Sequence, residues 1–353
     1  MIEYVADMDN LLLAFHKAQK GKMCKVEVRT FAANLQANLQ HLQHELLQGK
    51  VSVGNYHTFT IFDPKQRLIC AAAFSERVLH HALMLVCHPY FERHLVYNTY
   101  ATRLGKGTYA ALDYAHRCAS RFNYVAKLDV RKYFDSIDHD ILKTQLEALF
   151  KDRRLLQVLH QIIDTYETTP HRGLPIGNLT SQYFANHYLS GLDHYSKERL
   201  HVAAYVRYMD DILIFGDDRY ELRRQVDAIK CHAAELLHLE MKPPLVVSTG
   251  QGVSFLGYRL QGHRIGLNSR SRNRLHHKMG IYTQLLESGQ WSEHDYQQHV
   301  TPLFSFAQHA YTKKSRQSLI REVESRRAPT ASIAAAAGTT TPGTAACRTA
   351  TTT

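Results

Sequence analysis

Two adjacent aspartates inside an apolar, strand-like segment constrain this chain more than any other feature. In VRYMDDILIF, residues 206–215, Asp210 and Asp211 lie between aliphatic and aromatic residues that are typical of β-strands. Burying two like charges side by side is unfavourable unless something positive lies against them. The sequence therefore predicts a strand–turn–strand unit with a positive partner beside its carboxylates.

A third carboxylate belongs to another apolar strand, in KLDVRKYF, residues 127–134. Two strands that each end in a carboxylate can bring Asp129 beside Asp210. Such a pair can hold two Mg²⁺ ions about 3.5–4 Å apart, and these ions would neutralise the acidic residues. An Asp-Asp pair by itself is more often a solvated turn, so the interpretation depends on the motifs around it.

Six motifs in this chain resemble those of reverse transcriptases, in the same order and over roughly residues 60–260. They are DPKQRLI, YATRLGKGTYAAL, KLDVRKYF, GLPIGNLTSQYFANHYL, RYMDDILIF and FLGYRL. The resemblance implies an α+β right-hand polymerase with fingers, a palm built on an antiparallel sheet, and a helical thumb. It also implies an enzyme, an RNA-directed DNA polymerase that uses two Mg²⁺ ions, template RNA, a primer or cDNA strand, and dNTPs.

The same resemblance assigns roles to individual residues, with Asp129, Asp210 and Asp211 as the catalytic set, in which Asp211 assists electrostatically. The residues matched to the metal site are Asp129, Val130, Asp210 and Asp211. The residues matched to nucleotide binding are Lys65, Arg67, Phe134, Ile176, Gly177 and Gln182. Those matched to the primer grip are Phe255, Leu256, Gly257 and Tyr258, and those matched to template contact are Arg77, Arg103 and Lys106. Basic side chains beside a turn suit charge-assisted contacts to a triphosphate, but without the flanking motifs they would be ordinary surface residues. Lys242 is either a proton donor to pyrophosphate or a solvated lysine.

The segment IGNLTSQ departs from the common reverse transcriptase pattern, with Ile176-Gly177 where most relatives have Gln-Gly. It is similar to the form found in diversity-generating retroelements, whose enzymes misincorporate opposite template adenines. An aliphatic Ile176 cannot hydrogen-bond the nucleotide as glutamine does, so discrimination would depend more on shape. This subtype commonly works with a small, basic accessory protein oligomer, which the resemblance implies as a partner.

Two alternatives to the retroelement subtype remain open. One is a retron, group II intron-derived or abortive-infection reverse transcriptase, which has the same chemistry with ordinary fidelity. The other is a non-catalytic nucleic-acid-binding relic, against which the intact set of Asp129, Asp210 and Asp211 argues.

Composition is compatible with a nucleic-acid partner and excludes few other classes. The 353 residues carry a formal net charge of +11, which usually indicates a polyanionic partner. No apolar stretch approaches the roughly 20 residues of a membrane span, and the N-terminus is a poor signal peptide, so we expect no membrane association and a location in the cytoplasm of a bacterial or phage-infected cell. The six cysteines are scattered and indicate neither a zinc site nor a disulfide framework.

The pattern along the chain predicts strands near the middle and helices towards both ends. The alternation in YHTFTIFDPKQRLICAA, residues 56–72, predicts two short strands around the turn DPKQ. We expect fingers and palm over residues 1–262, a helical thumb over 263–326, and an Ala/Thr-rich disordered tail over 327–353. Asp138 is the expected N-cap of a helix that starts with HDILKTQ. The tail is either a plain flexible segment or a by-product of a template repeat that overlaps the end of the reading frame.

Overall fold

The computed structural model describes residues 1–62 and 66–310, and the chain divides into two compact units. Among the described residues, unit 1 comprises those within Met1–Leu256 and Leu260–Arg264, and unit 2 comprises Gly257–Arg259 and residues 265–310. The domain boundary predicted after residue 262 falls in the stretch where the chain passes between the units. Lys65, the end of the predicted thumb and the predicted tail lie outside the described residues.

The first part of unit 1 is mostly helical, as the spacing of its apolar residues predicts. The helices are α1 (Ile2–Val5), α2 (Met8–Gln19), α3 (Val26–Ala33), α4 (Leu35–Gln48) and α5 (Phe74–His94). Between α4 and α5, strands β1 (Tyr56–Ile61) and β2 (Arg67–Ala72) pair in an antiparallel manner. This pairing confirms the two strands predicted on either side of the DPKQ turn.

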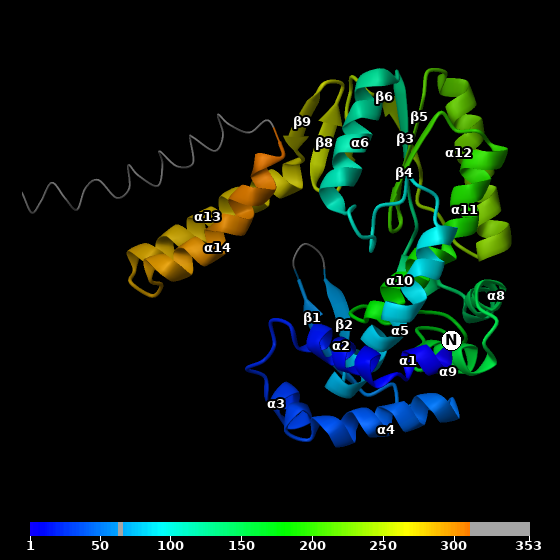
Figure 1. Cartoon of the computed structure of the whole chain (residues 1–353). Helices are drawn as coiled ribbons and strands as arrows, with labels where there is room; N and C mark the ends of the chain where they lie inside the picture. The colour runs from blue at the N-terminus through cyan, green and yellow to red at the C-terminus, as the bar shows by residue number, and fades with distance from the viewer. Residues whose placement is uncertain (63–65, 311–353) are drawn as a thin grey trace, which may run out of the picture. The chain divides into compact units, whose positions relative to one another are not determined.

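The centre of unit 1 is a four-stranded antiparallel sheet with the order β4-β5-β3-β6. Its strands are β3 (Tyr124–Asp129), β4 (Ala204–Tyr208), β5 (Asp211–Gly216) and β6 (Leu245–Ser248). Helices α6 (Thr108–Arg121) and α12 (Arg219–Leu237) pack against this sheet (Figure 1). We did not predict α6 and β6 from the sequence. The sheet with its packed helices confirms the α+β class.

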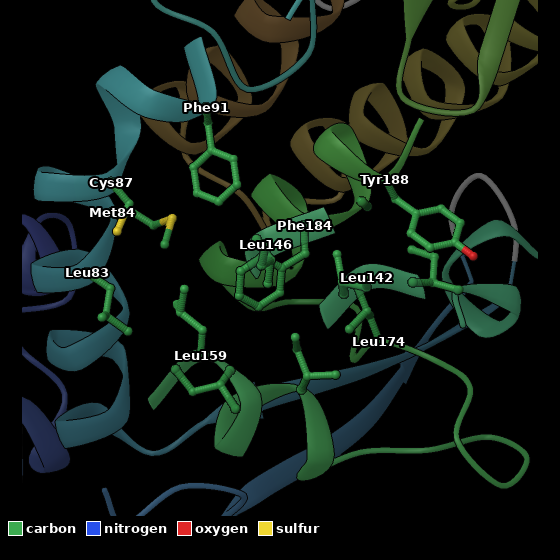
Figure 2. Packing of buried hydrophobic residues seen from close by; sticks show 14 of the residues in the cluster. Leu83, Met84, Cys87, Phe91, Leu142, Leu146, Leu159, Leu174, Phe184 and Tyr188 are labelled. Atoms are coloured by element: carbon green, nitrogen blue, oxygen red, sulfur yellow. The ribbon is translucent and has the colours of Figure 1, made fainter. Parts of the chain in front are cut away.

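A second group of helices shares one apolar core with the sheet. These helices are α7 (Tyr133–Ser136), α8 (His139–Leu149), α9 (Arg153–Asp164), α10 (Leu179–Tyr188), α11 (Ser190–His194) and the π-helical turn η1 (Tyr195–Arg199). Figure 2 shows side chains of α5, such as Phe91, directed towards Leu146 of α8 and Phe184 of α10. Asp138 caps α8 by accepting hydrogen bonds from the amides of Asp140 and Ile141, as predicted.

Near the end of unit 1 the chain forms a three-stranded sheet with the order β7-β8-β9, whose residues are divided between the two units. Its strands are β7 (Val253–Phe255), β8 (Tyr258–Gln261) and β9 (Arg264–Leu267). In unit 2, helices α13 (Ser269–Glu287) and α14 (Glu293–Gln308) pack against each other around Leu275, Met279, Val300 and Ala307. None of the helices within residues 1–62 and 66–310 is long and apolar enough to cross a membrane.

Candidate active site

The three carboxylates meet where β3 and the β4–β5 hairpin end. The register of the antiparallel pair β3–β5 places Asp129 directly opposite Asp211. Tyr208 pairs with Asp211 across the hairpin, so Met209 and Asp210 form a two-residue turn between them. We expected Asp129 to lie beside Asp210, and the register shows that its paired neighbour is Asp211, with Asp210 next to both in the turn.

Two lysines provide the positive charge that the acidic pair requires. Nζ of Lys127 lies 2.9 Å from Oδ1 and 2.9 Å from Oδ2 of Asp211. Nζ of Lys242 donates to Oδ1 of Asp129 over 2.6 Å, and the backbone amide of Lys242 donates to the carbonyl of Asp129. Lys242 is therefore paired with Asp129 while its side chain stays 40% exposed, and its role as a proton donor stays a prediction. Lys127, which the sequence analysis missed, lies two residues before Asp129 and so on the same face of β3.

Burial and repulsion between carboxylates raise the pKa of two of these residues, Asp210 and Asp211. Burial, and then the charge of Asp129, raises the pKa of Asp210, whereas the charges of Lys242 and Arg67 oppose this shift. Burial raises the pKa of Asp211 to about 6, although the ion pair with Lys127 opposes the shift. A group of carboxylates that repel one another in this way gains most from a cation placed among them.

The residues present fit a divalent metal ion by their chemistry. Oxygen ligands from carboxylates are those that Mg²⁺ prefers, and Asp129, Asp210 and Asp211 supply them from one edge of the sheet. Over the described part of the chain, no three His, Cys, Asp or Glu side chains are already arranged around one point as metal ligands. At this edge, Lys127 binds the carboxylate of Asp211 and Lys242 binds the carboxylate of Asp129.

The segment Ile176-Gly177 lies against strand β2, where the amide of Cys70 donates to the carbonyl of Ile176 over 2.8 Å. Gly177 has a φ of +129°, and a Cβ at this position would lie 2.9 Å from the carbonyl oxygen of Cys70. Only glycine allows this close approach, so the position needs the residue that the motif provides. Arg67, at the start of β2, is close enough to Asp210 to influence its pKa.

Two further residues matched to nucleotide binding occupy different surroundings. Phe134 lies on α7 and is partly buried against the main core, and its carbonyl accepts a hydrogen bond from the amide of Leu174. Gln182 is exposed on α10. Lys65 lies outside the described residues.

The basic residues that we matched to template contact all have partners within the chain. The side chain of Arg103 is only 6% exposed. Its guanidinium donates hydrogen bonds to the carboxylate of Glu92 and to the carbonyls of Val96 and Thr99. Arg77 pairs with Glu27. This arrangement does not support the prediction for Arg103, because its buried side chain holds a loop together and does not present its charge to a template.

Lys106, the third of these basic residues, lies 4.0 Å from the centre of the Tyr97 ring. Burial, and then the charge of Arg103, lowers the pKa of Lys106 to about 8. Its ammonium group therefore makes a cation–π contact with Tyr97 within the chain.

The segment matched to the primer grip forms a tight hairpin between β7 and β8. Leu256 and Gly257 are the two turn residues, with φ values of 49° and 90°. Phe255 is buried, and the hydroxyl of Tyr258 donates to the carbonyl of Phe306 over 2.6 Å. Two consecutive residues with positive φ are typical of the turns that match the twist of paired strands, although leucine is strained at such a position.

Known proteins that resemble this chain do so at low sequence identity, and three examples illustrate this. A protein described as the putative COX1/OXI3 intron 1 protein of Saccharomyces cerevisiae is 20% identical over 57% of this chain and 26% of its own length. Protein YkfC of Escherichia coli is 22% identical over 73% of this chain and 80% of its own length. The structure of apo telomerase from Candida tropicalis matches with a TM-score of 0.50 and 11% identity, covering 82% of this chain and 64% of that one.

The fold and the family follow from these comparisons. The structural match supports the right-hand polymerase fold that the motifs predict. The matched region is about a quarter of the yeast protein, so that protein has much more chain than the part compared. The family model for reverse transcriptase (RNA-dependent DNA polymerase) matches residues 62–260, which include the three carboxylates and the hairpin β7–β8. The chain belongs to the reverse transcriptase family.

Proposed function

We propose that this chain is an RNA-directed DNA polymerase whose reaction takes place at Asp129, Asp210 and Asp211. The single observation that carries the proposal is the register of β3 and β5, which pairs Asp129 with Asp211 and leaves Asp210 in the adjoining turn. Three carboxylates from two segments of the chain thereby lie near one another at the edge of the sheet, and membership of the reverse transcriptase family is consistent with this use of them.

The proposed metal ligands are the three aspartates, with the carbonyl of Val130 beside them. Divalent ions such as Mg²⁺, when bound there, activate a primer 3′-hydroxyl and stabilise the pyrophosphate that leaves. Lys127 and Lys242 keep the carboxylates in place and neutralised until then. We assign Arg67 to triphosphate binding, because its charge acts on the pKa of Asp210 and so lies near the site.

The remaining assignments are positional. Phe134 is proposed to lie under the nucleotide sugar, with Ile176, Gly177 and Gln182 along the nucleotide and the hairpin turn Leu256-Gly257 at the primer. The proposed substrates are template RNA, a DNA primer and dNTPs, to which a net charge of +11 is suited.

The test is incorporation of dNTPs on a defined RNA template with a DNA primer and Mg²⁺. Asp210→Asn should abolish incorporation, because the variant lacks a metal ligand. It should still fold cooperatively, because asparagine removes a buried charge. Asp227→Asn, at an exposed position on α12, is the matched control and should retain full activity. If Asp210→Asn incorporates dNTPs as well as the wild type does, the assignment of the site is wrong.

A finer proposal is that the enzyme copies adenines inaccurately, as enzymes of diversity-generating retroelements do. The support is Ile176, whose carbonyl is bound to Cys70 and whose aliphatic side chain has no group that can hydrogen-bond a nucleotide. The cDNA made by wild type and Ile176→Gln, with and without a basic accessory protein of the kind this subtype uses, should be sequenced. Errors concentrated at template adenines and reduced in Ile176→Gln would support the proposal, whereas even, infrequent errors in both would contradict it.

The second candidate function is a group II intron-derived or retron-type reverse transcriptase of ordinary fidelity. One observation favours it: the yeast relative is described as an intron protein. The same sequencing experiment decides between the two, because faithful cDNA from the wild type is the result expected here.

A further inference from the structure

A fully buried arginine lies directly behind the turn that carries Asp210. The side chain of Arg207, on β4, is 0% exposed, and its Nη1 donates to the carbonyl of Met209 over 3.2 Å. Its Nε and Nη2 donate to the two carboxylate oxygens of Asp193 over 2.6 and 2.5 Å. Nη1 and Nη2 also donate to the side-chain oxygen and the carbonyl of Asn186 over 2.9 and 3.0 Å. The guanidinium therefore joins the turn to α10 and α11.

Stability alone does not explain this buried ion pair. Both Arg207 and Asp193 are 0% exposed, so folding removes two charges from water. A buried ion pair is often no more stabilising than apolar residues of similar volume in the same place. What the pair provides, and an apolar pair does not, is a rigid planar donor that can hold a carbonyl oxygen in one position.

The turn needs to be held because two effects oppose its geometry. Met209 has a φ of 52°, a left-handed conformation that is unfavourable for a residue with a side chain. Repulsion from Asp129 also acts on Asp210. Arg207 binds the carbonyl of Met209, the residue between β4 and Asp210. This contact therefore opposes both the relaxation of the Met209 backbone and the displacement of Asp210 away from Asp129.

The arginine itself is fixed by the backbone around it. Its amide donates to the carbonyl of Asn98 over 3.0 Å, and its carbonyl accepts from the amide of Tyr100 over 3.0 Å. The side chain of Asn186 also donates to the carbonyl of Ala101 over 3.0 Å. The main chain of Arg207 and the Asn186 side chain that accepts from its guanidinium are thus both held by neighbouring backbone, so the guanidinium can act as a fixed support for the turn.

We propose that Arg207 is a positioning residue, which holds the Met209–Asp210 turn so that the carboxylate of Asp210 stays in place to bind metal beside Asp129. Arg207 makes no contact with the proposed substrates and acts through the Met209 carbonyl. The inference rests on the proposed function in that it assigns a metal-binding task to Asp210.

The experiment separates positioning from stability by removing the buried pair as a unit. Arg207→Met leaves the buried Asp193 without a charged partner and should lower the melting temperature. Arg207→Met/Asp193→Leu replaces both charges by apolar side chains and should recover most of that melting temperature. The double variant should nevertheless bind Mn²⁺ more weakly than the wild type, as followed by electron paramagnetic resonance without dNTP, and should lose roughly 100-fold in the rate of dNTP incorporation.

Tyr205→Phe is the matched control, because the Tyr205 hydroxyl donates to the same Asp193 over 2.6 Å but does not contact the turn. It should lower the melting temperature and leave Mn²⁺ affinity and the incorporation rate unchanged. The proposal is overturned if the double variant recovers Mn²⁺ affinity and incorporation together with its melting temperature. It is also overturned if Tyr205→Phe weakens Mn²⁺ binding as much as the double variant does.

A further variant, Arg207→Lys, covers the case in which the double variant does not fold. Its single ammonium group keeps the charge opposite Asp193 but cannot also hold the Met209 carbonyl. We expect a folded protein with weakened Mn²⁺ binding, and wild-type binding would contradict the proposal. Because Mn²⁺ binding is measured without turnover, a wild type that binds Mn²⁺ but incorporates no dNTP would refute the proposed function and leave the role of Arg207 to be judged by metal affinity.

Discussion

The Nζ of Lys127 lies 2.9 Å from each carboxylate oxygen of Asp211, and it also donates to the carbonyl of Ser254 over 2.8 Å. One ammonium group therefore connects a proposed catalytic carboxylate with strand β7. The charge that makes the acidic pair tolerable before any metal binds is part of the sheet itself, two residues from Asp129 on the same strand.

Lys127→Met should destabilise the metal-free protein by about 1–3 kcal/mol, since a partly buried carboxylate loses its charged hydrogen bond. Mg²⁺ should narrow the difference from wild type, because a bound cation replaces the missing charge. The measurement is chemical unfolding with and without Mg²⁺. Lys143→Met breaks another lysine–aspartate pair, with Asp164, away from the site, and there Mg²⁺ should leave the difference unchanged. An equal response of both variants to Mg²⁺ would contradict this account.

Gly177→Ala should cost about 1–3 kcal/mol of unfolding free energy, because the new Cβ meets the Cys70 carbonyl at 2.9 Å in a backbone conformation with a φ of +129°. Displacement of β2 should also raise the KM for dNTP, since Arg67 lies on that strand. Gly280→Ala, in the middle of α13 with open space around its Cβ position, should be neutral or slightly stabilising. Melting curves and dNTP titrations of the two variants provide the comparison.

His187 should make the fold sensitive to acid. Its ring is buried with both nitrogens unpartnered, and burial lowers its pKa to about 3. The unfolded chain has a histidine pKa near 6.5 and so binds a proton that the folded chain rejects, which makes stability fall as the pH drops below about 6.5. At pH 5 the loss amounts to about 2 kcal/mol from this residue.

His187→Leu should therefore lose less stability than the wild type between pH 7 and pH 5, as measured by urea unfolding at the two values. His41→Leu, at an exposed position on α4, is the control and should follow the wild type. Equal losses in all three proteins would show that His187 is protonated without cost in the folded state.

Arg103→Met should behave as a stability variant rather than a template-binding variant. The side chain holds Glu92 and the carbonyls of Val96 and Thr99, so its removal should cost about 2–4 kcal/mol of unfolding free energy. Template affinity, measured well below the melting temperature, should change no more than in Arg93→Met, which removes an exposed arginine. A large loss of affinity in a stable Arg103→Met protein would restore the role we first assigned.

The parts of the fold that sequence could predict are those with a strong local signal. Alternating residues around the DPKQ turn predicted β1 and β2, and the paired aspartates between apolar runs predicted the hairpin β4–β5. Strand β6, Leu245–Ser248, was missed because it is short, follows two prolines and becomes a strand only by pairing with β3. Pairing between strands that are far apart in the chain produces little signal in a short stretch of sequence.

The site divides in the same way. A carboxylate within an apolar strand is unexpected in the sequence because burying its charge is unfavourable, so Asp129, Asp210 and Asp211 could be found. The partners of basic residues are not visible, because an arginine reads the same whether it faces a phosphate or, as Arg103 does, a glutamate from the preceding helix. The position of Lys127 next to the acid on the same strand face was a usable signal, since residues two apart share a face.

The strand order β4-β5-β3-β6 has a consequence for how the protein is made. Strand β3 is synthesised first, but both of its neighbours, β5 and β6, come much later in the chain. A nascent chain on the ribosome cannot complete the palm sheet until the segment ending at Ser248 has emerged. Closing such long loops slows folding. Until β5 and β6 are available, both edges of β3 lack hydrogen-bond partners, and unpaired strand edges favour aggregation of the growing chain.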